Sequence, residues 1–140
     1  IDPKENPTFC LDVTKKNTND EFFSKADMIY DTGSLGYTKD PISSLNFLND
    51  LLKTDGVIVH QSSHNGFIKT GYFQFNLQFF LDYYAQNDKE IISTCYGFFS
   101  SWLKKLTLGK WKIDIDEKPN IERIKKEKNS LYFVVKKRDK

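Results

Sequence analysis

The sequence predicts an α/β fold with three layers, in which a mostly parallel β-sheet is covered by helices on both faces. Apolar runs of strand length alternate along the chain with segments of helical periodicity. One run, residues 57–59, is continuously apolar, as expected for a strand buried on both faces. The length of 140 residues is typical of a single domain. These observations together favour one domain over residues 1–140.

The first half of the chain contains three expected strands and two expected helices. The strands are short apolar runs: residues 8–13, 26–30 and 57–59. Helix-capping residues precede the first helix, a short one at residues 21–23. The second helix begins at Pro41, a position that suits proline, and ends before the polar residues 53–56. Its apolar residues follow helical spacing: Ile42, Leu45, Leu48, Leu51 and Leu52.

The second half begins with the polar residues 60–75, which we expect to form a long loop. Asn76 is placed to cap a helix that continues to residue 87. Two further apolar runs predict strands: residues 91–96, within the segment 90–99, and residues 131–135. Between these strands, residues 100–129 are expected to be an irregular insertion. Three residues of this insertion alternate like an edge strand: Trp111, Ile113 and Ile115.

Composition favours a cytoplasmic protein. Cys10 and Cys95 are far apart in the sequence and lie in apolar runs, as expected for buried free thiols in a reducing compartment. No apolar run approaches the roughly 20 residues of a membrane helix. The first residues are polar and do not resemble a signal peptide. No cluster has the spacing of a metal site, so we expect neither a membrane segment nor a bound metal.

Charge is distributed unevenly along the chain. Residues 101–140 hold thirteen basic and six acidic residues, a net charge of +7, whereas the first hundred residues have a net charge of −5. A basic terminal third can meet an anionic partner, but lysines of this kind more often form a solvated surface. We favour the solvated surface and do not expect nucleic acid as the partner.

Three strings of the sequence carry a family resemblance. "ADMIYDTGSLGYTKDP" combines an acid, an apolar run, a small-residue turn and an Asp-Pro pair that begins a helix. "LNFLNDLLKTDGVIVHQS" joins a helix to a strand through a Lys-x-Gly-Gly-like turn, with Gly56 at the second glycine. "TGYFQFNLQFFLDYYAQN" is similar to a His-Gly-Phe-Tyr-Gln-Phe-Ser-Pro signature, with Thr70 in place of the histidine. Over residues 1–98 and the last strand, the chain resembles the C-terminal portion of class I S-adenosylmethionine-dependent methyltransferases.

The resemblance implies a Rossmann-like sheet whose final strand is antiparallel to the others. It also implies that the chain is an N-terminally incomplete fragment of such a domain. The family's glycine-rich cofactor loop follows its first strand, but the glycines here are all at position 33 or later. The chain begins at Ile1 rather than Met, and its first three residues resemble the end of the family's second strand. We therefore expect either a missing N-terminal segment or an oligomer that completes the sheet.

Five residues are candidates for binding S-adenosylmethionine, the cofactor that the resemblance implies. A carboxylate at Asp2 can accept hydrogen bonds from ribose hydroxyls, although a terminal acid can also be disordered. Asp12 matches a position near the adenine, or it caps the end of a strand. Asp31, Thr32 and Gly33 end a central strand at the edge where such sheets bind ligands. The alternative for these three is an ordinary turn between strand and helix.

The acceptor side of the predicted site lies in residues 60–75. His60 and His64 are the chain's only histidines, and either can act as the base that deprotonates an acceptor hydroxyl. Of the two, His64 is the preferred catalytic candidate. Asn65 is a candidate for substrate binding, and Tyr72 and Phe73 can wall the acceptor pocket. The alternatives are a backbone-bonded His60, a solvent-facing His64, and aromatic rings that only dock the loop onto the core.

These residues lead to two hypotheses from different classes. The first is transfer of a methyl group from S-adenosylmethionine to an oxygen or nitrogen of a small molecule or sugar by a truncated chain. The second is a non-catalytic methyltransferase-like module that binds a partner protein. The missing glycine-rich loop motivates the second hypothesis, because a sheet without its central strand exposes an edge that favours association.

Overall fold

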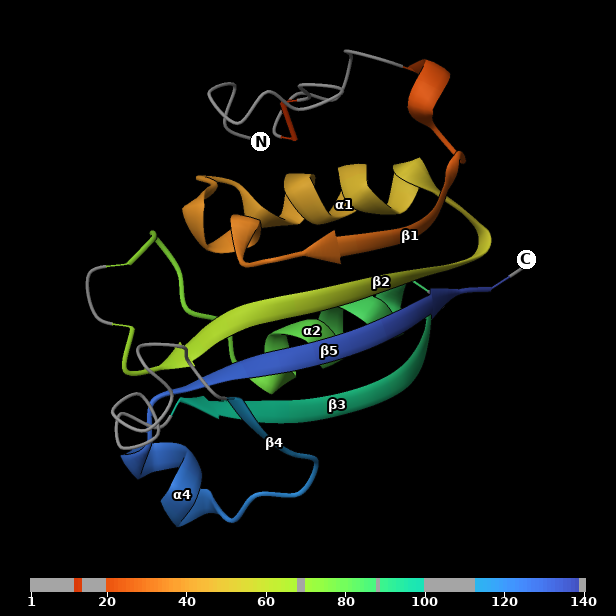
Figure 1. Cartoon of the computed structure of the whole chain (residues 1–140). Helices are drawn as coiled ribbons and strands as arrows, with labels where there is room; N and C mark the ends of the chain where they lie inside the picture. Colours follow the sequence, from red (N-terminus) through yellow and green to blue (C-terminus); the bar gives the residue numbers. More distant parts are fainter. Residues whose placement is uncertain (1–11, 14–19, 68–69, 88, 100–112, 139–140) are drawn as a thin grey trace, which may run out of the picture.

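The computed structural model describes residues 12–13, 20–67, 70–87, 89–99 and 113–138 (Figure 1). They form one five-stranded sheet in the order β1-β2-β5-β3-β4. The strands are β1 Ala26–Asp31, β2 Leu52–Asn65, β3 Lys89–Phe99, β4 Ile113–Asp116 and β5 Asn129–Lys137. The α-helices are α1 Pro41–Leu51, α2 Leu77–Gln86 and α4 Ile121–Lys126, and two 3-10 helices are η2 Asp20–Phe22 and η3 Ser34–Tyr37. The expected strand at residues 8–13 lies almost entirely outside the described residues.

The expectation of a mostly parallel sheet is wrong for the described strands. Only β1 and β2 pair in parallel, whereas the pairs β2–β5, β5–β3 and β3–β4 are all antiparallel. The reason is the position of β5, which lies between β2 and β3 and runs opposite to both. The final strand is thus antiparallel, as the family resemblance implied.

Both large helices pack on the same face of the sheet. Leu45 of α1 and Phe80, Tyr83 and Tyr84 of α2 belong to one buried cluster. Three alternate residues of β5 complete this cluster from the sheet: Leu131, Phe133 and Val135. Figure 1 shows α2 behind β2 and β5. The described residues therefore form two layers where the sequence predicted three.

The opposite face of the sheet carries apolar side chains that are exposed or half-buried. Met28 and Tyr30 of β1 are 67% and 53% exposed. Their register partners on β2, Val57 and Val59, are half-buried. The run at residues 57–59 is continuously apolar because its residues on the outward face are apolar too. An apolar sheet face of this kind is suited to being covered by another segment or molecule.

Each α-helix begins after an Asp or Asn that caps it. The side chains of Asp40, Asn76 and Asn120 accept hydrogen bonds from backbone N–H groups three residues later, which satisfies donors that the helix itself cannot pair. The Ser43 hydroxyl and N–H both donate to Asp40 and hold the pKa of that carboxyl below its usual range. The cap at Asn76 was predicted from the sequence, and so was the start of α1 at Pro41.

Two sequence assignments are corrected by strand pairing. Residues 60–65 were expected to be a loop, but they extend β2 because β5 pairs with them as far as Asn65. Residues 100–129 were expected to be irregular, but their described part contains β4 and α4. In both cases polar residues occupy regular structure, because backbone pairing and capping by neighbouring segments outweigh local composition. The edge strand expected around Ile113 and Ile115 is present as β4.

Candidate functional site

The candidate site lies where the carboxyl ends of β1 and β2 meet. These two strands are parallel, and Asp31, the last residue of β1, is the register partner of His60. In sheets of this kind ligands bind beyond the carboxyl ends of the parallel strands. The segments that continue from the two strands, η3 and residues 70–76, therefore form the edge at which a ligand would be bound.

A buried chain of hydrogen bonds joins Asp31, His60 and Tyr84. His60 Nδ1 lies 2.9 Å from Asp31 Oδ2, and His60 Nε2 lies 2.5 Å from the Tyr84 hydroxyl. Burial raises the pKa of Tyr84, so its hydroxyl stays protonated and donates to Nε2. Nδ1 is then the protonated nitrogen and donates to the Asp31 carboxylate. The hydrogen-bond partners of the two ring nitrogens therefore determine the tautomer of His60. Both nitrogens of His60 are thus occupied by protein groups.

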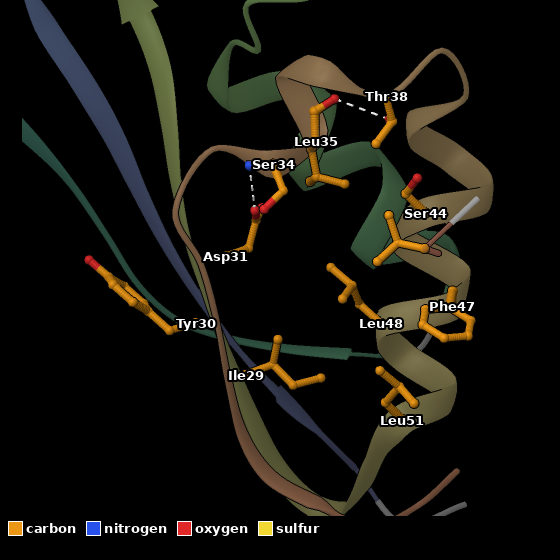
Figure 2. Close-up of a pocket in the computed structure, with 11 residues that line it drawn as sticks. Ile29, Tyr30, Asp31, Ser34, Leu35, Thr38, Ser44, Phe47, Leu48 and Leu51 are labelled. Atoms are coloured by element: carbon orange, nitrogen blue, oxygen red, sulfur yellow. Dashed lines mark hydrogen bonds between the residues drawn. The ribbon is translucent and has the colours of Figure 1, made fainter. Parts of the chain in front are cut away.

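This arrangement indicates that His60 and Asp31 have structural roles. His60 has no exposed surface, and its ring stacks on Phe80 with 5.0 Å between centroids. Asp31 is 4% exposed, and its second carboxylate oxygen accepts a hydrogen bond from Ser34 N–H at 2.9 Å (Figure 2). Neither side chain has a free polar atom directed to a ligand. The alternative of a backbone-bonded His60 is wrong, because the two hydrogen-bond partners of His60 are side chains.

His64 differs from His60 in having one ring nitrogen available. Its Nδ1 lies 3.0 Å from Asn129 Oδ1. The Asn129 amide nitrogen donates to the carbonyls of Ile124 and Glu127, which fixes the oxygen toward His64. His64 Nδ1 must therefore carry the proton, and Nε2 keeps its lone pair. Among the residues that the structure describes, Nε2 has no hydrogen-bond partner, so His64 retains the chemistry of a base.

Asn65 holds the end of α4. Its side-chain nitrogen lies within 3.1 Å of three carbonyl oxygens: those of Ile124, Lys125 and Glu127. These are carbonyls that a helix leaves unpaired at its C-terminus. The Asn65 amide N–H groups are therefore used inside the protein, which favours a structural role over the predicted substrate contact.

Two glycines clamp the segment after β2 onto η3. The N–H groups of Tyr72 and Phe73 both donate to the Gly36 carbonyl, at 2.5 and 3.1 Å. A Cβ atom on Gly71 would lie 2.5 Å from the same carbonyl oxygen, and Gly71 has φ +71°. A side chain at Gly71 is thus disfavoured by both space and backbone conformation. We call this contact the glycine clamp.

The glycine clamp presents aromatic side chains to solvent. Tyr72 is 66% exposed and Phe73 is 42% exposed. Tyr37, which follows Gly36, is 63% exposed. The predicted acceptor residues therefore divide into two groups at one edge, with Tyr72 and Phe73 against η3, and His64 and Asn65 against β5 and α4.

A cavity of about 240 Å³ lies between β1 and α1. Figure 2 shows Ile29, Leu48 and Leu51 facing one another across it, while Tyr30 projects from the other side of the strand. Asp31, Ser34 and Thr38 line its polar end, where the Thr38 hydroxyl donates to the Leu35 carbonyl. The cavity is apolar apart from this end and suits a small apolar group.

The described residues include four of the five predicted cofactor-binding residues. Asp2 lies outside them, and Asp12 is exposed. Thr32 is exposed at the end of β1, and Gly33 has φ +93° and begins η3. Of the five predicted residues, Thr32 and Gly33 thus fit a ligand at this edge, whereas the Asp31 carboxylate does not.

The described part of the chain contains a free thiol but no cluster of metal ligands. It contains no group of three or more His, Cys, Asp or Glu side chains that could hold a metal ion. Cys95 is a half-buried free thiol whose pKa is raised by burial, and Cys10 lies outside the described residues. None of the described helices combines the length and apolar character needed to cross a membrane.

Comparison with solved structures identifies the fold. The chain is similar to the crystal structure of a SAM-dependent (S-adenosylmethionine-dependent) methyltransferase from Thermotoga maritima, described as a possible histamine N-methyltransferase. The TM-score is 0.61 at 14% identity, over 96% of this chain and 67% of that one. The fold is that of a SAM-dependent methyltransferase. No protein-family model matches the sequence, and no curated protein sequence is significantly similar to it.

Two further solved structures are similar to the chain. One comes from work on the conversion of a disulfide bond into a thioacetal group during echinomycin biosynthesis, with a TM-score of 0.55 at 8% identity. The other is the MccD protein, with a TM-score of 0.55 at 9% identity. Each match covers 91% of this chain but only 54% and 66% of the other. The chain therefore spans about half to two thirds of the length of the structures that it matches.

Three features of the site were missed from the sequence. Tyr84 lies in the helix that was expected to continue to residue 87, but nothing in the sequence indicated that its hydroxyl would contact His60. Asn129 lies in a charged segment and gave no signal of its own. The glycine clamp joins residues 35 positions apart, Gly36 and Gly71, and only their glycine identity hinted at close backbone contact.

Tyr84→Phe tests the buried chain of hydrogen bonds. The substitution keeps the ring but leaves His60 Nε2 buried without a donor, which we expect to cost about 1–3 kcal/mol of unfolding free energy. Tyr30→Phe is the matched control, because the Tyr30 hydroxyl bonds to Gln61 at an exposed site. We expect that control to change stability by less than about 0.5 kcal/mol. Urea unfolding at neutral pH measures both, and equal effects would argue against the network.

Gly71→Ala tests the glycine clamp. The added methyl group would meet the Gly36 carbonyl oxygen, so we expect the N–H groups of Tyr72 and Phe73 to lose their acceptor and exchange faster with solvent. Gly66→Ala is the matched control, since Gly66 also has positive φ but its added Cβ would meet carbon atoms of Lys128 at 3.0–3.2 Å rather than the carbonyl of the glycine clamp. Hydrogen exchange followed by NMR gives the comparison. Unchanged protection of both N–H groups in Gly71→Ala would contradict the clamp.

Proposed function

We propose that this chain takes part in S-adenosylmethionine-dependent methyl transfer to an oxygen or nitrogen of a small molecule or sugar, and that it supplies the acceptor side of the site. The fold supports this proposal, since methyltransferases are among the structures it matches. The possible histamine N-methyltransferase in that group offers a nitrogen acceptor as a precedent.

The observation that carries the proposal is the state of His64. It lies at the carboxyl end of β2, and hydrogen bonding to Asn129 leaves the lone pair of Nε2 available. When bound, S-adenosylmethionine supplies an electrophilic methyl group. His64 Nε2 would take the proton that the acceptor hydroxyl or ammonium group gives up. Orientation of the acceptor would come from the exposed edge at Thr32, Gly33 and the glycine clamp.

A second candidate function is partner binding without catalysis. The observation that favours it is the exposed apolar face of the sheet, with Met28 and Tyr30 largely in solvent. A protein partner, or a further segment of the same protein, could cover this face. Light scattering, which gives the mass in solution, is combined with cofactor titration to separate partner binding from catalysis. A monomer that binds cofactor disfavours the partner-binding function. A stable complex that does not bind cofactor favours it.

Calorimetric titration with S-adenosylhomocysteine, the demethylated cofactor, tests the proposed function. The sample is the full protein, meaning this chain with any sequence that its gene adds, and the chain alone is titrated in parallel. We expect saturable binding of S-adenosylhomocysteine by the full protein, and the parallel titration shows how much of this binding the chain alone supplies. Absence of saturable heat from the full protein would remove the main support for the methyltransferase proposal.

His64→Gln then tests the base within the same proposal. In a transfer assay with a tritiated methyl group, we expect kcat to fall about 100-fold, as for the loss of a general base. Binding of S-adenosylhomocysteine should stay unchanged, which also controls for intact folding. An unchanged kcat would exclude His64 as the base.

A further inference from the structure

We infer that the acceptor is a flat aromatic or heteroaromatic ring, and that it stacks on an aromatic patch made of Tyr37, Tyr72 and Phe73. The inference rests on the proposed function, because it names the substrate class of the same site. It extends that function by excluding sugars from the acceptors considered above.

The aromatic patch combines large rings with high exposure. The three side chains are between 42% and 66% exposed. They come from two segments that follow different strands, and the hydrogen bonds from Tyr72 and Phe73 to the Gly36 carbonyl bring these segments together. Single exposed apolar residues are common, but several gathered at one ligand-binding edge indicate a contact surface.

Packing of the loop does not explain the exposed rings. Phe75 is 7% exposed and packs on Phe79 and Phe80, with centroid distances of 4.5 and 5.8 Å. It is Phe75, therefore, that docks the segment onto the core. Phe73 stacks on Phe75 at 6.0 Å between centroids, so a buried ring supports it from below. Tyr72 and Phe73 can bind a ligand without loss of core contacts.

The polar groups near the aromatic patch favour a flat ring over a sugar. Recognition of a sugar requires several hydrogen-bonding side chains in addition to a stacking ring. Here the Gln74 amide donates to the Phe67 carbonyl, the Asn65 amide donates to α4, and the Asp31 carboxylate is filled by His60 and Ser34. What remains exposed is mainly ring surface, which stacks on another ring with offset or edge-to-face geometry.

NMR titration with indole and with glucose tests this inference. We expect indole to shift the amide resonances of residues 36–38 and 71–74 in a saturable manner, and glucose to leave them in place. Tyr72→Ala should weaken indole binding about tenfold, as for the loss of one stacking ring. Tyr30→Ala, which removes an exposed tyrosine from the opposite sheet face, is the matched control and should leave indole binding unchanged.

Each other outcome overturns the inference. Indole that shifts no resonances of the aromatic patch, or that binds Tyr72→Ala as tightly as the unaltered chain, removes the stacking site. Glucose shifts as large as those of indole contradict the preference for a flat ring. The titration contains no cofactor, so its failure leaves the S-adenosylhomocysteine result standing, and a failure of cofactor binding leaves the ring-binding result standing.

Discussion

The hydrogen bonds from His60 to Asp31 and Tyr84 connect the three elements on which the candidate site depends. They tie the end of β1 to β2 and to α2 inside the buried core. A buried polar group is tolerated only when it is paired, so these three side chains constrain one another strongly. The position of each strand end relative to α2 is fixed by this constraint.

The constraint extends outward to the surface. The second oxygen of Asp31 accepts the Ser34 N–H and so orders the turn that begins η3. From η3, the Gly36 carbonyl holds the N–H groups of Tyr72 and Phe73. A sequence of direct contacts thus leads from the buried imidazole to the exposed aromatic patch. It explains how a polar segment after β2 can present large rings in defined positions.

The two histidines have different roles because their partners differ. His60 is enclosed by two side chains and has no free nitrogen, whereas His64 shares only one nitrogen with Asn129. Asn65 is likewise occupied, because its amide donates to carbonyls at the end of α4, whereas other residues of this edge remain accessible to a ligand. Proximity in sequence to a histidine is therefore a poor guide to function here, and hydrogen-bond satisfaction is a better one.

Helix starts and strand positions were predictable because they depend on local signals. Pro41 and Asn76 mark their helices directly, and the apolar runs of β1 and β5 are short and clear. The extension of β2 through Asn65 was not predictable, because it depends on pairing with a strand more than sixty residues later. The structure brings Asp31 and His60 together at the end of β1, as predicted for one edge of the sheet, but the buried role of His60 depends on Tyr84, which no local pattern connects to it.

The proposed ligand-binding edge is the carboxyl edge of β1 and β2. The most direct measurement is a ¹⁵N NMR map of the full protein with S-adenosylhomocysteine. We expect the largest shifts at Thr32 and Gly33, with little change at Asp55 and Gly56, which lie toward the opposite end of β2. Shifts centred on Asp55 and Gly56, or on the exposed sheet face at Met28 and Tyr30, would contradict the account.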